Sequence, residues 1–423
     1  MATQMGHGSS EQVAQACEYI TGTLLSQDAA KAFTQNVKDK CNNLKKMCEQ
    51  KLWHQLSLLL EDCVEDAEFQ RIPGLLIDLY TNFVLLFALR LNSLKLAQIA
   101  VKVSQQHTLP QQAVEFLECT KKLLDDAASG SSPLSSSGGA SSSKEGEKEA
   151  DKVDTEPTLY LKMSVGQLFL QSGNTEKASE LMEAGLKMLD KIEDADPSVT
   201  ASVYSLSSQY HKVNRNFDEF YKNSLLYLAY VKTETLPSDF RLSLAVDVSL
   251  AALLGEGIFN FGELLLHPIV TALVGTEFEW LHALLKCFNK GDMYAYDMIC
   301  ERYSSALNRQ PELVKKADSL RNKITLLCLV EYLFSLPPDS RSVPLDEIAS
   351  RAKLGSREEA EVVIMQAMAR GMVKGMINQV SGVVTVSWVQ PRVLTHEQVQ
   401  GLSTRLESWA AKLNGTTSAL VAQ

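Results

Sequence analysis

The sequence lacks the local patterns from which most metal and redox sites are built. Its eight cysteines include no CxxC pair, and its seven histidines include no HxH and no HExxH pattern. Zinc sites need ligands at such close spacing, and no Ser-His-Asp or Cys-His arrangement can be singled out either. We therefore expect no metal, no cofactor, no catalytic residue and no small-molecule substrate. Several cysteines lie among apolar residues at helical spacing, which favours reduced thiols in a core.

Long hydrophobic runs and an excess of positive charge are also missing. The densest apolar stretch, Phe83 to Leu91, already contains Arg90, whereas a membrane span needs about 18 apolar residues or more. The first residues, Met1 to Ser10, are small and polar and do not form a secretion signal. A net charge of −10 opposes general binding to nucleic acids or anionic lipids. We expect a cytoplasmic and nuclear protein that binds neither nucleic acids nor membranes.

The composition that is present fits a mainly α protein with room for several domains. The chain has 423 residues, of which 45% are hydrophobic and 22% charged, as in ordinary globular proteins. One segment, Ala127 to Glu156, is rich in Ser and Gly, then in charge, and contains almost no large apolar residue. Since it cannot offset the entropy of ordering, we predict a mobile loop or linker between helical regions at residues 1–126 and 157–319.

The region after this segment repeats a helical pair. Leu159 to Leu170 and Ala178 to Leu189 both show helical periodicity, and Ser172 to Asn174 predicts the turn between them. Two further pairs follow at a period of about 35 residues, which is typical of a tetratricopeptide-like solenoid. Those pairs are Val203 to Val213 with Phe217 to Val231, and Leu242 to Leu254 with Phe261 to Leu273.

Residues 320–394 follow the order helix, helix, helix and hairpin, which predicts a winged helix. The expected elements are Leu320 to Phe334, Leu345 to Ala352, a third helix capped by Ser356 with Glu359, and strands at Val373 to Val380 and Val383 to Val389. Val384, Val386 and Trp388 alternate with Thr385 and Ser387 along the second strand. We expect Val383, Thr385 and Ser387 to bind a partner on the face opposite Trp388, on a strand that presents an edge.

A winged helix suggests DNA binding, because its third helix would enter the major groove. From Ser356 to Arg370, however, two arginines stand against three glutamates, and the middle, Val362 to Met365, is apolar. Phosphate contacts need Lys and Arg, so this helix favours packing against protein, and a winged-helix regulator remains the alternative. Gly255-Glu256-Gly257 lacks the following GK[ST] of a phosphate loop and predicts only a turn.

The last segment, residues 395–423, contains an apolar seam. Its members step by 3, 4, 3 and 4 residues, the spacing of a coiled-coil helix, and are Val399, Leu402, Leu406, Trp409 and Leu413. A single helix of this length must bury the seam on its own domain or on another chain, and we favour binding to a partner.

Four strings then carry a resemblance to a known family: KLWHQL from Lys51, LLGEGIFNFGELLLHPIV from Leu253, LDEIA from Leu345 and WVQPRVL from Trp388. In this order they resemble the family of 26S proteasome non-ATPase regulatory subunit 13. The resemblance implies a non-catalytic scaffold in the lid of the regulatory particle. In that family a PCI winged helix packs beside neighbouring PCI subunits, and the C-terminal helix joins a shared bundle. A PCI subunit of the COP9 signalosome or of an initiation factor is the alternative.

Overall fold

The computed structural model describes residues 10–24, 35–72, 74–88, 90–107, 109–128, 155–192, 194–336, 341–390 and 396–421. The chain divides into two compact units. Unit 1 comprises Met1–Arg215 with Lys222–Val231, and unit 2 comprises Asn216–Tyr221 with Lys232–Gln423. Helices dominate both units, and the small sheet lies in unit 2. This architecture confirms the predicted fold, a mainly α chain in which helical repeats precede a winged helix.

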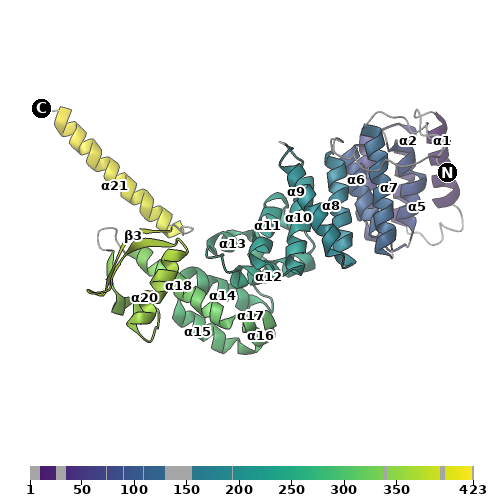
Figure 1. Ribbon diagram of the computed structural model, residues 1–423. Coiled ribbons are helices and arrows are strands. Elements are labelled where there is room, and N and C mark those ends of the chain that lie inside the picture. The colour runs from purple at the N-terminus through teal and green to yellow at the C-terminus, as the bar shows by residue number, and fades with distance from the viewer. Residues whose placement is uncertain are drawn as a thin grey trace, which may run out of the picture. The chain divides into compact units, whose positions relative to one another are not determined.

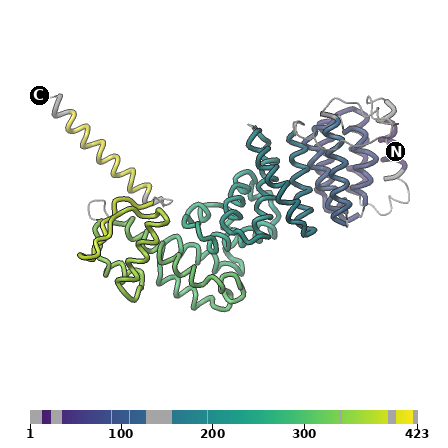
Figure 2. Tube along the Cα trace, in the orientation of Figure 1, coloured from purple at the N-terminus to yellow at the C-terminus, as the bar shows by residue number. Residues whose placement is uncertain are grey.

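Helices of unit 1 stand side by side, and the trace runs up and down between them (Figures 1 and 2). Its elements are α1 (Ser10–Tyr19), η1 (Ile20–Leu24), α2 (Gln35–Glu49), α3 (Trp53–Glu65), α4 (Ala67–Gln70), α5 (Leu75–Asn82), η3 (Val84–Phe87), α6 (Ser93–Ser104), α7 (Pro110–Ala128), α8 (Glu156–Gln171), α9 (Thr175–Leu189), α10 (Pro197–Val213) and most of α11 (Phe217–Tyr230).

Unit 2 contains the later helices and the sheet (Figure 1). Its elements are the start of α11, η4 (Thr233–Thr235), α12 (Ser238–Leu254), α13 (Gly262–Leu266), η5 (Pro268–Leu273), α14 (Glu279–Lys290), α15 (Met293–Arg302), α16 (Ser304–Asn308), α17 (Pro311–Lys315), α18 (Ala317–Ser335), β1 (Ser342–Pro344), α19 (Leu345–Arg351), α20 (Arg357–Ala369), β2 (Val373–Asn378), β3 (Val383–Val389) and α21 (His396–Val421).

The predicted hairpin of α8 and α9 is present, and the turn residues explain its geometry. Gly173 adopts a φ of 83°, a left-handed conformation that glycine reaches without steric cost. Asn174 then caps α9, because its side chain accepts a hydrogen bond from the backbone N–H of Lys177. Helices α8 and α9 therefore pack against each other, and both also contact α10.

The chain is not divided where the Ser/Gly-rich segment predicted. Helix α7 before this segment packs on α8 after it, and Leu161 and Val165 of α8 share one core with Leu96 of α6 and Leu117 of α7. The flanking helices extend to Ala128 and from Glu156, while residues 129–154 lie outside the described residues. The helices on the two sides of this segment belong to a single core in unit 1.

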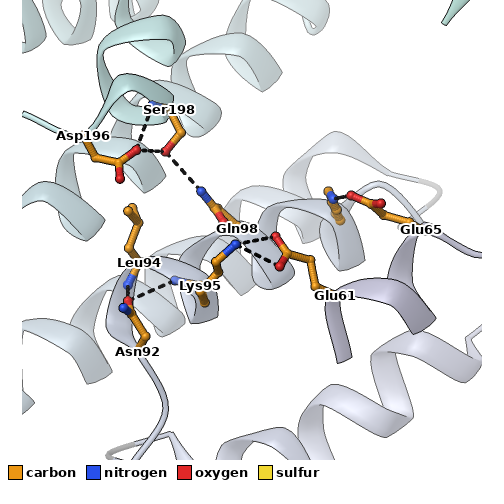
Figure 3. Close-up of polar contacts among 9 residues, drawn as sticks. Glu61, Glu65, Asn92, Leu94, Lys95, Gln98, Asp196 and Ser198 are labelled. Atoms are coloured by element: carbon orange, nitrogen blue, oxygen red, sulfur yellow. Dashed lines mark hydrogen bonds and ion pairs between the residues drawn. The ribbon is translucent and has the colours of Figure 1, made fainter. Parts of the chain in front are cut away.

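Polar contacts also join the two sides of that connection. Gln98 of α6 donates from Nε2 to the Ser198 hydroxyl of α10 at 3.1 Å, and Ser198 donates to Asp196 at 2.6 Å (Figure 3). On the same helix, Lys95 pairs with both carboxylate oxygens of Glu61 from α3 at 2.8 Å. Helix α6 is therefore fixed to α3 on one side and to the start of α10 on the other.

One predicted helix of unit 2, Phe261 to Leu273, is split into α13 and the 3-10 helix η5. Pro268 causes the break, because proline lacks an N–H and disfavours the helical conformation of the residue before it. His267 accordingly has an extended ψ of 135°, and its Nδ1 accepts a hydrogen bond from the backbone N–H of Ile269 at 3.2 Å. The repeat therefore ends in two short helices where a single long one was expected.

The winged helix consists of α18, α19, α20 and an antiparallel sheet with strand order β1-β3-β2. Ser356 caps α20 as predicted, since its hydroxyl accepts from the N–H of Glu359 at 3.3 Å. The Glu359 carboxylate accepts from the N–H of Gly355 at 2.9 Å, one residue before the position that a standard capping box would use. One apolar core, which includes Leu329, Ile348, Ile364 and Val384, holds these helices on the sheet.

Candidate protein-interaction surfaces

Helix α21 carries the predicted seam on an open surface. All five seam residues lie within this helix, and between 49% and 62% of each side chain is exposed. Every side chain described from 399 to 417 is exposed, including those between the seam positions. An amphipathic helix normally buries its apolar stripe against a core, so the exposed seam is a candidate contact surface.

The sheet of the winged helix differs from the prediction in which strand forms its edge. The three-residue strand β1, which the sequence pattern did not reveal, pairs with β3 from Ser342 opposite Thr385 to Pro344 opposite Val383. Strand β3, the second strand of the hairpin, is therefore central, and the edges are β1 and β2. The expectation that β3 presents an edge is wrong, because β1 covers it.

A bulge also changes the face on which Trp388 lies. The pairing of Lys374 with Trp388 is followed by that of Gly375 with Val386, so Ser387 is an extra residue in β3. Val384 and Val386 point into the core as predicted, but Trp388 is exposed and Val389 is buried in its place. The alternation expected for Trp388 is wrong, because the extra residue reverses the direction of every side chain after it.

The outer face of the sheet therefore gathers polar and apolar side chains. Thr385 and Ser387 are exposed there as predicted, whereas Val383 is only half-buried at the end of the strand. Trp388 joins them on this face, beneath the ammonium group of Lys374 at 5.1 Å from the ring centre. Met376 of the edge strand β2, opposite Thr385 in the ladder, is 74% exposed. Met376 and Trp388 are members of this surface that the sequence pattern did not identify.

Helix α20 presents no basic surface to a nucleic acid. Its buried side includes Ile364, while Val362 and Met365 are 47% and 48% exposed. Glu358, in the first turn, is exposed, and a backbone hydrogen bond at the helix start lowers the pKa of its carboxyl, with the Ser356 hydroxyl adding to this effect. A negative first turn and an apolar middle fit a protein surface and not a phosphate backbone.

We predict that the full-length chain forms no salt-sensitive complex with duplex DNA at micromolar concentrations. Counterion release requires Lys and Arg contacts to phosphates, and α20 offers almost none. Fluorescence anisotropy of a labelled duplex at low and high salt measures this directly. Tight binding at low salt that falls steeply as salt increases would contradict the prediction and favour a winged-helix regulator.

The glycine pair at Gly255 and Gly257 is a structural turn, as predicted. The N–H of Gly257 donates to Oδ1 of Asp218 at 3.1 Å, so that amide is occupied by a protein carboxylate. Glu256 lies near Lys316 at 3.7 Å, and Glu263 accepts from the side chain of Asn260 at 3.2 Å. Each glutamate therefore contacts a residue near the end of a helix.

Burial distinguishes the cysteines from one another. Cys41, Cys48, Cys63 and Cys287 are buried, whereas Cys119 is exposed. Burial raises the pKa of the Cys63 thiol to about 12, which opposes thiolate chemistry at neutral pH. Across the part of the chain that the structure describes, no group of three or more His, Cys, Asp or Glu residues is placed to hold a metal ion. No helix among the described residues is long and apolar enough to cross a membrane.

A helical-repeat array that leads into a winged helix defines the chain as a PCI protein. In agreement, the model of the PCI domain matches residues 300–388. The region before it matches the model described as PSD13 N-terminal repeats over residues 40–285. The chain belongs to the family of 26S proteasome non-ATPase regulatory subunit 13, which confirms the resemblance carried by the four sequence strings.

Individual relatives support this family. The 26S proteasome non-ATPase regulatory subunit 13 homolog B of Arabidopsis thaliana is 41% identical over 382 residues, which cover 90% of this chain and 93% of that protein. The 26S proteasome regulatory subunit RPN9 of Saccharomyces cerevisiae is 32% identical over 366 residues, which cover 86% of this chain and 87% of that protein. Eukaryotic translation initiation factor 3 subunit M of Coccidioides immitis is 28% identical over 193 residues, which cover only 46% of this chain and 40% of that protein. The initiation-factor alternative is therefore less supported.

Proposed function

We propose that this chain is a non-catalytic scaffold of the proteasome regulatory-particle lid, acting in the cytoplasm and nucleus in ubiquitin-dependent protein degradation. Its helix α21 enters a bundle with helices of other lid subunits, and its winged helix packs on a neighbouring PCI subunit. The observation that carries this proposal is the seam of α21, whose five large apolar residues are all about half exposed. In the family to which the chain belongs, the relatives are named as regulatory subunits.

The chemistry of α21 points to other amphipathic helices as its partners. The helix contains two acidic and two basic residues, Glu397, Glu407, Arg405 and Lys412, and has no net charge from them. Selection by charge is therefore weak, and apolar packing at the seam supplies most of the affinity. An interior position in a multi-helix bundle would cover the seam from several sides, which a single flat surface would not do.

The winged helix offers a second contact surface through its outer face and the edge strand β2. Among the described strands, β2 pairs on one side only, so its other side has backbone groups available to a strand of a neighbouring chain. Strand β1, at the opposite edge, is only three residues long and includes Pro344, which cannot donate a hydrogen bond. We therefore assign the neighbouring PCI subunit to the β2 side, next to Thr385 and Ser387.

Affinity purification tests the assignment to the lid. The full-length chain, tagged at its N-terminus so that α21 stays free, is expected to recover other proteasome regulatory subunits in constant proportion. Recovery of signalosome or initiation-factor chains in their place would overturn the proposal. Recovery of the chain alone, at physiological salt, would show that it is not a stoichiometric scaffold.

A double substitution, Met376→Glu with Thr385→Glu, is expected to reduce incorporation into that complex by about tenfold or more, which corresponds to ~1.4 kcal/mol. Both residues are exposed in the free chain, so the folded state loses at most about 1 kcal/mol from the repulsion of two carboxylates that lie opposite each other in the ladder. In the interface both carboxylates would also be desolvated. Co-expression with the other lid subunits measures incorporation. The matched control is Leu58→Glu, also at an exposed position, which should assemble normally. Equal incorporation of all three chains would remove this face from the interface.

A further inference from the structure

A buried lysine joins the end of α12 in unit 2 to the winged helix of the same unit. Lys323, on α18, is only 5% exposed. Its Nζ donates to the backbone carbonyls of Ala252 at 2.7 Å, Leu253 at 3.2 Å and Gly255 at 2.7 Å. Two of these carbonyls belong to the last turn of α12, where no partner exists within the helix. A side chain from the winged helix therefore caps a helix of the repeats.

Aromatic rings complete the enclosure of this ammonium group. The Nζ of Lys323 lies 5.6 Å from the ring centre of Phe259 and 5.0 Å from that of Phe261, within the range of cation–π contacts. Phe259 also packs against the core of the winged helix, and the guanidinium of Arg370 lies 5.3 Å from its ring centre. The loop from 255 to 261 thus lies between α12, α18 and the end of α20, around the Nζ of Lys323.

The charges around Lys323 do not compensate for its burial. No carboxylate of the described residues lies within ion-pair distance of its Nζ, and its hydrogen-bond acceptors are neutral carbonyls. Asp218 of α11 is the negative charge that favours the ammonium form, but it is engaged by the N–H of Gly257 at 3.1 Å. Lys316, which precedes α18 and lies near Glu256 and the carbonyl of Leu254, is a further positive charge.

Burial, opposed by Asp218 and assisted by Arg370 and Lys316, lowers the pKa of Lys323 to about 7. A solvated lysine has a pKa of about 10.4. A neutral amine keeps two N–H donors, enough for the two carbonyls at 2.7 Å. When Lys323 is neutral, the closed arrangement therefore keeps its two shortest hydrogen bonds, to Ala252 and Gly255.

We propose that Lys323 makes this junction a proton-sensitive joint, in which falling pH loosens the attachment of the winged helix to the end of α12. In an opened joint, water surrounds Lys323, and the open form binds more protons than the closed form between about pH 7 and 10. Opening therefore becomes less frequent by up to tenfold for each unit of increasing pH in this window. Below about pH 7, Lys323 is charged in both the open and the closed form, so the frequency of opening no longer depends on pH.

Hydrogen exchange of the full-length chain between pH 6 and 9.5 tests the joint, after correction for the pH dependence of the chemical exchange rate. In the wild-type chain, protection of residues 252–261 and of α18 is expected to increase above about pH 7 by up to tenfold per unit. Lys323→Met should abolish this increase. Lys316→Met is the matched control, because this half-buried lysine also reaches α12 through the carbonyl of Leu254. It should retain the increase, beginning at a slightly higher pH because a positive charge near Lys323 is lost.

The proposal is overturned if wild-type protection does not change with pH, or if Lys323→Met retains the wild-type profile. If Lys323→Met does not fold, Asp218→Asn replaces it. The asparagine carbonyl can still accept from Gly257, but the charge that favours the ammonium group is lost. The window in which protection increases should then begin at a lower pH, and a profile identical to wild type would reject the joint.

Discussion

Leu406→Asp or Trp409→Asp in α21 is expected to exclude the chain from the assembled lid, with incorporation reduced by about 100-fold or more. Both side chains are exposed in the free chain, so its folded state loses almost nothing. In a bundle, an aspartate at either position would be buried without a partner, which is strongly unfavourable. The five seam residues are already half covered, so their full burial contributes roughly 4–8 kcal/mol before the costs of association. One unpaired carboxylate removes much of this contribution.

Co-expression with the other lid subunits, followed by purification, measures incorporation, and thermal unfolding of the free chain measures its stability. Ala411→Asp is the matched control, because residue 411 lies on the side of α21 opposite to the seam and is exposed. This variant should assemble and unfold as the wild type does. Normal incorporation of Leu406→Asp would contradict the bundle role. A lower unfolding temperature of the free Leu406→Asp chain would show that the seam packs on its own domain.

Local sequence signals predicted most of the elements in both units. Helical periodicity located α8 to α12, and the sequence Ser172 to Asn174 predicted a turn that Gly173 and Asn174 form as expected. Ser356 predicted the start of α20 for the same reason, since a short polar side chain satisfies a free N–H at a helix end. Such signals depend on residues within one turn of each other, so a single sequence contains them in full.

Features that depend on distant residues were not visible in the same way. The Ser/Gly-rich composition predicted a connection, but no local pattern reveals that Leu161 would share a core with Leu96 and Leu117. Strand β1 has only three residues, too few to show alternation, and its existence depends on the pairing with β3. The central position of β3 therefore could not be derived from the hairpin alone.

Two missed features left signals in the sequence. Gly375 interrupts the pattern of β2, and glycine within a strand often marks a bulge; a Cβ at this position would collide with the backbone oxygen of Thr385. Lys323 lies between Leu320 and Ile324 on the apolar stripe of its helix. A charge at a buried helical position indicates a specific polar partner, although only the fold shows that the partner is the end of α12.

Gly291→Ala is expected to destabilise unit 2 by about 2–5 kcal/mol, the largest effect of a single methyl group that we predict. Gly291 ends α14 with a φ of 64°, where a residue with a Cβ is strained. A Cβ there would also lie 2.8 Å from Cα of Cys328, 2.9 Å from its backbone nitrogen and 2.9 Å from the carbonyl oxygen of Leu327. These are backbone atoms in the middle of α18, so they cannot move aside as the end of a flexible side chain would.

Gly275→Ala separates the two causes of this loss. Gly275 has a similar φ of 77°, but no heavy atom lies within 4 Å of its Cβ position. Conformational strain alone should therefore cost about 1–2 kcal/mol there. Denaturant unfolding followed by tryptophan fluorescence reports on unit 2 through Trp280, which is buried in α14, the helix that Gly291 ends. If both variants lose the same free energy of unfolding, α14 and α18 separate easily at Gly291. If Gly291→Ala loses more, the difference measures how strongly the packing of α18 against α14 resists the added methyl group.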